Sequence, residues 1–276
     1  MTQPHGRPLP GELHVWWLPV PPGTSSGRAR SVLDAAETER AGRVRRPERR
    51  HRFVLAHAGL RLLCGRYLGT APGEVAFERA PCPHCGGGHG RPRLRDAGGL
   101  HFSMAHSGTA VLYAFSTAPV GVDLEAAPAR PGLERTVGAW LHPGERRQLH
   151  RLPQAERPGA FLRLWVRKEA YLKGIGTGIA HGVNGPPGSY DDEWALLDLG
   201  APEGFVAAAA VRGGAPKTLR CSSLSPSAVA RGTGAGTGTA VWSSVREAAG
   251  EVPRSLLAKV ASWPAPGGDG MERTPN

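Results

Sequence analysis

The stretch PVGVDLE, at residues 119–125, decides the fold that we expect for this chain. Its small residues and valines predict a buried strand that ends on two carboxylates, Asp123 and Glu125. Side chains two positions apart on a strand point to the same face of a sheet, so we expect the two acids to lie side by side. The simpler alternative is a solvated strand edge, where such a pair is common.

A third acid lies about forty residues further along the chain. The stretch FLRLWVRKEAYLKGIGTGI (161–179) predicts a helix with an apolar face, and Glu169 falls one turn after Trp165 at the edge of that face. Lys173 follows one turn later, and Gly174 is well placed to end the helix as its C-cap. Glu169 and Lys173 alone would also fit an ordinary i,i+4 pair on a helix surface.

Taken together, the three acids indicate a candidate metal site. Three carboxylates within reach of one another would raise one another's pKa, and a hard divalent cation would remove that cost. Mg²⁺ prefers carboxylate oxygens and substrate phosphates as ligands. The combination of the two motifs, with the family resemblance described below, favours a metal site over the two simpler alternatives.

The rest of the chain predicts a mixed α/β fold. The coarse order of strands and helices suggests two similar halves, each a small sheet packed with helices and related by a pseudo-twofold axis. Strands are predicted at 13–20, 73–80, 100–116 and 119–125, with a late hairpin within 194–214, and helices are predicted at 29–69, broken at Pro47, and within 132–174.

The composition changes beyond about residue 214. Ser, Gly, Thr and Ala dominate residues 222–240, and such a stretch cannot bury enough apolar surface to offset its ordering entropy. We expect an amphipathic helix within 241–263 and a flexible tail after it. The predicted division is an N-terminal half, a C-terminal half with the acids, and a low-complexity extension, at residues 1–118, 119–214 and 215–276.

The overall charge predicts an anionic partner. The 276 residues carry a formal net charge of +11 with a pI near 10.3, which suits nucleic acid, phosphorylated small molecules or an acidic protein. No apolar stretch is long enough to span a bilayer, and the first residues lack the hydrophobic core of a signal peptide. Four cysteines are too few for a disulfide scaffold in a chain of this length, so we expect a cytoplasmic protein with reduced thiols.

One short segment contains potential zinc ligands. CPHCGGGHG offers Cys82 and Cys85 together with His84 or His89. A structural zinc site usually has four ligands in paired clusters, and this segment has a single C-x-x-C. The pattern therefore favours a thiol-bearing loop, with zinc as the alternative.

The two acidic motifs resemble the paired signature of the 4′-phosphopantetheinyl transferases. Upstream, GRPRL (90–94) and HFSMAHSG (101–108) are similar to two further segments of that family. Length and the two-half plan resemble the monomeric, surfactin-synthetase-activator type, over about residues 13–214. The positions that match the paired signature are Gly121, Asp123, Glu125, Trp165, Lys168, Glu169, Lys173, Gly176 and Gly178.

The resemblance implies a transfer reaction. The family moves the phosphopantetheine arm of coenzyme A to a serine of an apo acyl or peptidyl carrier protein and releases 3′,5′-ADP. By this resemblance Asp123, Glu125 and Glu169 would hold Mg²⁺, with Mn²⁺ as an alternative ion. Glu169 would also act as the base, directly or through a water, and Lys173 would neutralise the diphosphate. A monomer serving polyketide or non-ribosomal peptide synthesis is implied.

The resemblance also implies where coenzyme A binds. His106 matches a phosphate-contacting histidine, and Arg91 stands where the family usually has lysine. Arg40 and Arg52 fall near other basic positions, although a solvated helix face explains Arg40 equally well. Glu145 resembles an acidic position near the site, with exposed helix surface as the alternative. Ala105 departs from the family, which often has serine before the histidine.

Two other functional classes compete with the transferase. The basic run RVRRPERRHR (43–52) would suit a nucleic-acid-binding module, but few aromatic residues are interleaved with its arginines. An inactive homologue that only binds carrier proteins is the other alternative, although all three acids and Lys173 are present. We expect an active enzyme without nucleic-acid or membrane partners.

Overall fold

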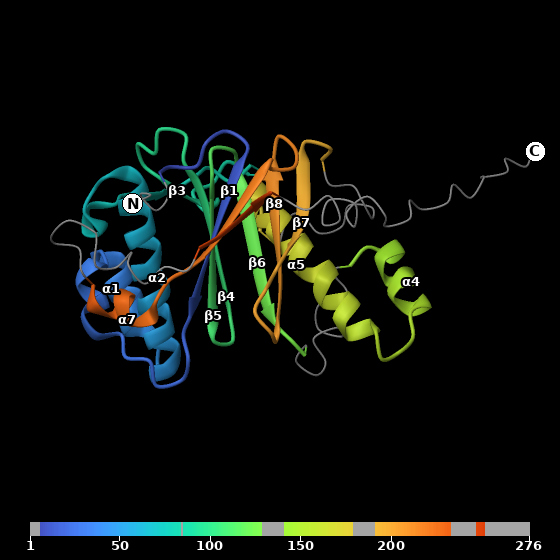
Figure 1. Ribbon diagram of the computed structural model, residues 1–276, viewed down its shortest axis with the longest axis horizontal. Helices are drawn as coiled ribbons and strands as arrows, with labels where there is room; N and C mark the ends of the chain where they lie inside the picture. The colour runs from blue at the N-terminus through green and yellow to red at the C-terminus, as the bar shows by residue number, and fades with distance from the viewer. Residues whose placement is uncertain (1–5, 84, 129–140, 179–190, 233–246, 252–276) are drawn as a thin grey trace, which may run out of the picture.

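The computed structural model describes residues 6–83, 85–128, 141–178, 191–232 and 247–251. Within these residues, three sheets pack against helices, and the predicted mixed α/β class is confirmed (Figure 1). The strands are β1 (Glu12–Pro19), β2 (Phe77–Arg79), β3 (Pro92–Leu94), β4 (His101–Ser107), β5 (Ala110–Ser116), β6 (Val120–Ala126), β7 (Trp194–Leu199), β8 (Phe205–Arg212), β9 (Thr218–Ser223) and β10 (Glu247–Glu251). The helices are η1 (Gly27–Val32), α1 (Ala35–Arg43), α2 (Pro47–Leu68), η2 (Pro72–Glu74), α4 (Pro143–Arg151), α5 (Arg157–Ile175) and α7 (Pro226–Arg231).

The main layers run from α2 through two sheets to α5. The larger sheet has the order β10-β9-β1-β5-β4, and the smaller has the order β6-β8-β7 (Figure 1). On β1, Trp16 and Leu18 belong to the core beneath α2, whereas Leu13 and Val15 belong to the core between the sheets. Alternate side chains of a strand point to opposite faces of the sheet. When both faces are covered, the sequence of the strand is therefore a continuous apolar run.

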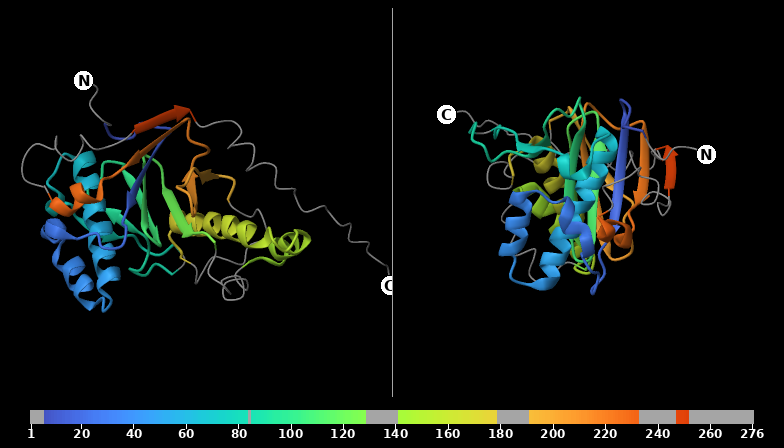
Figure 2. Two further views of the ribbon diagram at one scale, coloured as in Figure 1. Left: turned by 60° about the horizontal axis from the view of Figure 1, so that its bottom comes forward. Right: turned by 90° about the vertical axis from the view of Figure 1, so that its left-hand side faces the viewer.

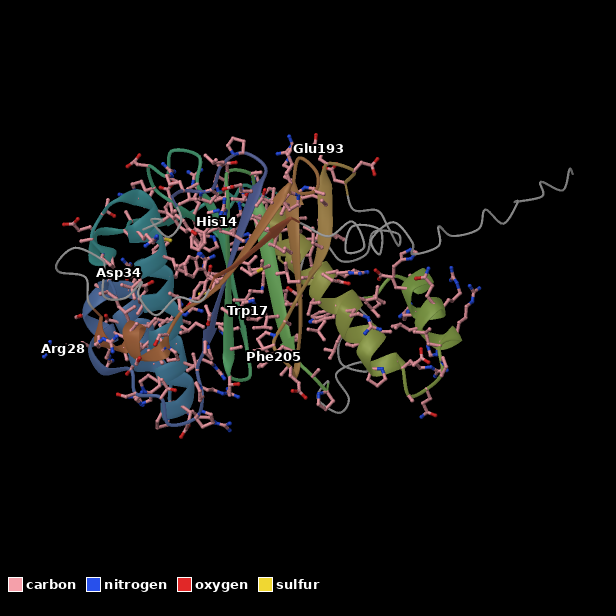
Figure 3. The ribbon with its side chains drawn as sticks, viewed as in Figure 1. His14, Trp17, Arg28, Asp34, Glu193 and Phe205 are labelled. Atoms are coloured by element: carbon pink, nitrogen blue, oxygen red, sulfur yellow. The ribbon has the colours of Figure 1, made fainter. Side chains whose placement is uncertain are left out.

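Alanines on β8 allow α5 to lie close to the smaller sheet. Ala208 and Ala210 pack with Val166 of α5, whereas the alternate alanines face the larger sheet. Figure 3 shows Glu193 and Phe205 at opposite ends of this three-stranded sheet, where β7 and β8 begin. The small residues bring the helix backbone near β6, the strand that carries the predicted acids.

Two serine hydroxyls join the sheets where β4 runs beside β6. Ser103 Oγ accepts a hydrogen bond from the Val122 N–H at 3.0 Å, and Ser107 Oγ accepts one from the Ala126 N–H at 3.1 Å. These bonds satisfy backbone donors of β6 that face away from β8. As a result, the acidic end of β6 lies next to the segment of β4 that contains His106.

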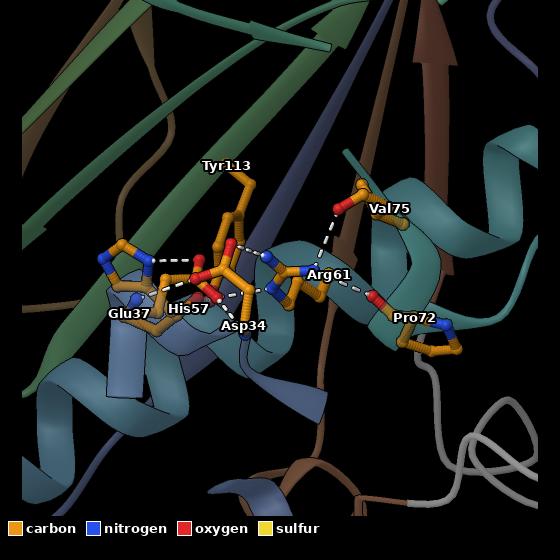
Figure 4. Close-up of polar contacts among 8 residues, drawn as sticks. Asp34, Glu37, His57, Arg61, Pro72, Val75 and Tyr113 are labelled. Carbon is orange, nitrogen blue, oxygen red and sulfur yellow. Dashed lines mark hydrogen bonds and ion pairs between the residues drawn. The ribbon is translucent and has the colours of Figure 1, made fainter. Parts of the chain in front are cut away.

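A buried arginine fixes the N-terminal helices. Arg61 is 1% exposed, and its guanidinium donates to the carbonyls of Val75 and Pro72 and pairs with Asp34 and Glu37 (Figure 4). Asp34 and Glu37 also form the capping box that starts α1, so one cation ties this helix to α2 and to the loop after it. Burial raises the pKa of Glu37, whereas the hydrogen bonds from His57 and Arg61 lower it. The net shift of this pKa is downward.

The segment after residue 214 contradicts the expectation from its composition. Residues 218–223 form β9, which pairs in parallel with β1, and α7 buries Ala228 and Val229 completely. Strand pairing supplies backbone partners that the low-complexity composition did not suggest. Within the region predicted as helix, residues 247–251 are instead the strand β10, paired with β9 (Figure 2). Residues 233–246 and 252–276 lie outside the described residues.

The end of α5 also differs from the prediction. The helix continues through Gly174 to Ile175, and Gly176 is the C-cap, with φ of 87°. Gly174 is required for packing instead, because a Cβ there would lie 2.5 Å from the Trp194 ring. The predicted break at Pro47, where α2 begins, is confirmed.

None of the helices in the described residues is long and apolar enough to cross a bilayer. The division at residues 118 and 214 and the pseudo-twofold relation stay predictions.

Candidate functional site

A cavity of about 680 Å³ opens between the N-terminal helices and the C-terminal end of α5. Four of the residues predicted to bind coenzyme A line this cavity, and they come from α1, the loop before β3, β4 and α5. They are Arg40, Arg91, His106 and Lys173. The structure therefore brings together residues that are more than one hundred positions apart in the sequence.

Arg52, the fifth predicted residue, lies beside the cavity without lining it. Its guanidinium donates to the Gly108 carbonyl at 2.5 Å, which fixes the turn between β4 and β5. Arg40 lies over the Phe53 ring, 5.5 Å from its centroid, so a cation–π contact holds its guanidinium at the cavity wall. Arg40 is nevertheless exposed, so a solvated helix face stays an alternative for this residue.

Arg91 spans the two halves of the protein. Its Nη1 donates to the Gly174 carbonyl at 2.5 Å, and its aliphatic stem packs on Gly176, the cap of α5. A cation at the C-terminal end of a helix is favoured by the helix dipole. Burial, and then the positive charges of Arg212 and Arg93, lower the pKa of Arg91. An anion in the cavity would relieve that repulsion.

His106 lies on β4 and lines the cavity. Burial, followed by the positive charges of Arg52 and Lys173, lowers its pKa from the ordinary value. An imidazole surrounded by cations gains a proton readily only when an anion arrives. A phosphate in the cavity would favour the protonated form of this ring.

The predicted acids lie next to the cavity, and Lys173 links the two. Lys173 Nζ donates to Asp123 Oδ1 at 2.6 Å, while the Lys173 side chain also lines the cavity wall. Glu125 accepts a hydrogen bond of 2.8 Å from the Ser107 hydroxyl. Asp123 is 6% exposed and Glu169 is 9% exposed, so two of the three acids are buried.

Two buried carboxylate oxygens of this group have no hydrogen-bond partner in the described part of the chain. They are Asp123 Oδ2 and Glu169 Oε1. An ionised oxygen buried without a partner costs several kcal/mol unless a proton or a cation is bound. Carboxylate oxygens of this kind are ligands that a hard divalent cation prefers.

The pKa values show how strongly the acids interact. Burial, followed by the charge of Asp123, raises the pKa of Glu169 to about 7, although Lys173 opposes this shift. Burial also raises the pKa of Asp123, while Lys173 lowers it and Glu125 raises it further. Glu169 is therefore expected to hold its proton to a higher pH than an ordinary glutamic acid.

Behind the acids, an ion pair holds α4 against α5. Lys168 Nζ donates to Glu145 Oε2 at 2.6 Å, and both residues are at most 5% exposed. Glu145 also accepts a hydrogen bond of 2.8 Å from the His142 N–H and so caps α4. Exposed helix surface, one of the two alternatives for Glu145, is wrong, because the residue is buried beside the helix that carries Glu169.

Sequence reasoning missed Ser107 and the wall formed by Glu37 and His57. Ser107 orients Glu125, but only the register of β4 against β6 reveals this contact. Glu37 and His57 line the cavity opposite His106 and are hydrogen bonded to each other at 2.9 Å. The spacing of Asp34 and Glu37 fits a capping box, and this sequence pattern could have indicated the helix start that forms part of the wall.

Comparisons with known proteins show which family the chain resembles. Residues 119–200 match the family model described as the 4′-phosphopantetheinyl transferase superfamily. The chain is 33% identical to the 4′-phosphopantetheinyl transferase HetI of Nostoc sp. (strain PCC 7120 / SAG 25.82 / UTEX 2576), over 74% of this chain and 90% of that protein. It is 32% identical to a putative 4′-phosphopantetheinyl transferase, slr0495, of Synechocystis sp., over 62% of this chain and 67% of that protein. It is 25% identical to Sfp of Bacillus subtilis (strain 168), over 55% of this chain and 64% of that protein.

Proposed function

Because the chain belongs to the 4′-phosphopantetheinyl transferase superfamily, we propose that its cavity and buried acids form one active site that Lys173 connects. The protein is an enzyme that transfers the phosphopantetheine arm of coenzyme A to a serine of a carrier protein, with release of 3′,5′-ADP. One observation carries the assignment of the site: Lys173 bonds to buried Asp123 and also lines the cavity.

The acids are proposed as the metal ligands. Asp123, Glu125 and Glu169 would hold a divalent cation, and their hard oxygen donors favour Mg²⁺ with Mn²⁺ as a substitute. Such an ion supplies charge neutralisation at a diphosphate when it is bound. The unpartnered oxygens of Asp123 and Glu169 support this role, since each needs a cation or a proton.

Glu169 is proposed as the base. The serine oxygen of the carrier attacks the β-phosphorus of coenzyme A, and its proton passes to Glu169, directly or through a water. The bond from that phosphorus to the oxygen bridging to the nucleotide breaks, and 3′,5′-ADP leaves with the electron pair. A carboxylate with a pKa of about 7 is well matched to proton transfer near neutral pH.

The basic residues are proposed to bind the nucleotide end of coenzyme A. Lys173 would move its charge from Asp123 to the diphosphate, while Arg91 and His106 would contact the 3′-phosphate. Arg40 and Arg52 would add positive potential at the wall and at the turn beside it. The cavity volume of about 680 Å³ suits a nucleotide-sized ligand.

The finer aspects of the partner are proposals as well. The basic surface suits an acidic carrier-protein helix, and we propose carriers of polyketide or non-ribosomal peptide synthesis. We further propose that the enzyme acts as a cytoplasmic monomer without nucleic-acid or membrane partners.

Mass spectrometry of a carrier tests the function. Protein, coenzyme A, Mg²⁺ and a panel of apo acyl and peptidyl carriers should yield carriers heavier by one phosphopantetheine. Asp123→Asn and Glu169→Gln should abolish the mass change, whereas Asp198→Asn, a carboxylate paired with Arg167 elsewhere on α5, should not. Unchanged carrier masses across the panel, with coenzyme A still bound, would support the inactive-homologue alternative instead.

A further inference from the structure

Three soft ligand atoms meet in the loop that joins β2 to β3. The side chains of Cys82, Cys85 and His89 each offer one ligand atom, and these atoms lie within 4.8 Å of one another. Cys85 Sγ and His89 Nε2 are 3.0 Å apart, which is within hydrogen-bonding distance. Cys82 is 2% exposed, whereas Cys85 and His89 are exposed. The cluster is thus anchored on its inner side and open on its outer side.

The backbone of the loop is shaped around these side chains. The Cys82 N–H donates to the Gly87 carbonyl at 2.7 Å, and the Gly86 N–H donates to the Cys82 carbonyl at 2.8 Å. Gly86 has a φ of 70°, a left-handed conformation that turns the chain back directly after Cys85. A Cβ at Gly87 would lie 3.3 Å from Cys85 Sγ and 3.2 Å from the His89 ring, so the chain wraps closely around the ligands.

We propose that Cys82, Cys85 and His89 bind Zn²⁺ as a structural ion, with solvent as the fourth ligand. Thiolate and imidazole are the ligands that zinc prefers, and a C-x-x-C spacing places two sulfurs on one ion. Binding releases the two thiol protons to solvent, and two thiolates with a neutral imidazole balance the charge of the cation. The site is chemically opposite to the acidic group, whose oxygen donors select hard ions.

The ion would reinforce one wall of the cavity. His89 lines the cavity together with Gly90 and Arg91, its neighbours in sequence. Gly90 is pressed against the preceding strand segment, since a Cβ there would lie 2.3 Å from the Ala80 carbonyl oxygen. The Ala80 N–H also donates to the Arg91 carbonyl at 3.0 Å. Zinc would therefore close a loop whose far end positions the Arg91 guanidinium.

This inference changes the interpretation of the single C-x-x-C. From spacing alone, the segment favoured a thiol-bearing loop, because a second pair of ligands was missing. The fold brings His89, one of the two histidines in the segment, to 3.0 Å from Cys85, and solvent would supply the fourth ligand. His84 lies outside the described residues. The zinc proposal does not rest on the proposed transferase activity, because it depends on ligand geometry alone.

Metal analysis of the full chain tests the proposal. The protein, freed of any affinity tag and kept reduced with a phosphine, should bind one equivalent of Zn²⁺ that excess Mg²⁺ does not displace. Replacement of zinc by Co²⁺ should give the intense visible bands of a tetrahedral ion and a thiolate-to-cobalt band in the near ultraviolet. A carboxylate site would give only weak visible bands, so the two sites are distinguishable.

Matched variants locate the ion. Cys85→Ser, at an exposed position, should lose the thiolate band and the stoichiometric zinc, and His89→Ala should weaken zinc binding and alter the visible bands. Cys221→Ser changes a partly buried thiol elsewhere, and Asp123→Asn changes the acidic group, so both should keep the bands. The proposal is overturned if reduced, folded protein takes up no stoichiometric zinc, or if Cys85→Ser leaves the cobalt spectrum unchanged. It is equally overturned if Cys82 and Cys85 form a disulfide whose reduction yields no metal binding.

Discussion

Gly121 of β6 and Gly174 of α5 lie directly against each other where the strand crosses the helix. A Cβ on Gly121 would lie 2.4 Å from the Gly174 nitrogen and 2.0 Å from the Ala170 carbonyl oxygen. Asp123 follows Gly121 by two residues, and Lys173 directly precedes Gly174. The close crossing therefore brings Asp123 Oδ1 to 2.6 Å from Lys173 Nζ. The two glycines therefore set the distance between the acids and the cation that links them to the cavity.

Gly121→Ala should damage both stability and activity. The added methyl overlaps backbone atoms that cannot move aside, so we expect a loss of at least about 3 kcal/mol in the free energy of unfolding. Displacement of Asp123 should lower the transfer rate by on the order of 100-fold. Urea unfolding and carrier mass spectrometry measure the two effects.

Gly42→Ala is the matched control. Gly42 lies in α1 with open space where its Cβ would be, so alanine should stabilise the helix by up to about 1 kcal/mol. Equal destabilisation by the two substitutions would show that the crossing of β6 and α5 is less tight than the structure indicates.

The metal-free protein should become less stable as the pH rises from about 4.5 to above 7. The folded-state pKa of Glu169 is about 7, above the ordinary value of 4.5, so its contribution to stability is complete below 4.5 and is lost as the pH passes 7. One pKa unit corresponds to about 1.4 kcal/mol, which limits this loss to about 3 kcal/mol. Chemical unfolding in a chelator across this pH range measures it.

Glu169→Gln should remove that pH dependence, because the amide does not titrate. Mg²⁺ should stabilise the wild type more at pH 8 than at pH 6, since it binds the ionised acids, and should have little effect on Glu169→Gln. A wild-type stability that is independent of Mg²⁺ at pH 8 would contradict the proposed metal ligands.

Lys168→Met should destabilise the protein by about 3–5 kcal/mol. The substitution leaves the Glu145 carboxylate buried at 4% exposure without its ionic partner. Glu145→Gln in the same chain should restore much of the loss, because the amide can still cap α4 and carries no charge. Arg167→Met, which breaks a more exposed pair with Asp198 on the same helix, should cost less. A cost for Lys168→Met no greater than that for Arg167→Met would argue against a structural role of the buried pair.

Coenzyme A should bind more tightly as the pH falls from 8 towards 6. The pKa of His106 is lowered, by burial first and then by Arg52 and Lys173, and a bound phosphate should raise it again. Binding should therefore be accompanied by proton uptake, which calorimetry in buffers of different ionisation enthalpy detects. His106→Gln should reduce that uptake, and an unchanged uptake would assign the proton to another group.

The two acidic stretches predicted the core of the site because each carries its own periodicity. Residues 119–125 and 161–179 specify a strand and a helix, and buried acids on both elements imply that they meet. The contact between Lys173 and Asp123 was not predicted, because a crossing angle and distance are properties of tertiary packing. Ser107 was missed for the same reason, since its bond to Glu125 depends on the register between strands of different sheets.

Local patterns also failed where two residues were equivalent in sequence. Gly174 and Gly176 both qualify as helix caps, and only the position of Trp194 decides that Gly174 stays inside α5. Glu145 was left open between a position near the site and exposed helix surface, because the sequence does not show which element covers it. Beyond residue 214, the composition concealed β9, whose backbone pairing with β1 needs little side-chain hydrophobicity.

The pairing of β9 with β1 has a consequence for synthesis on the ribosome. During translation, β1 emerges about two hundred residues before β9. Until β9 has been synthesised, one hydrogen-bonding edge of β1 is therefore unpaired. An open apolar edge is a template for wrong pairing with other chains. A nascent chain stalled after residue 118 should therefore aggregate or recruit chaperones, whereas one released beyond residue 232 can close its largest sheet around β1.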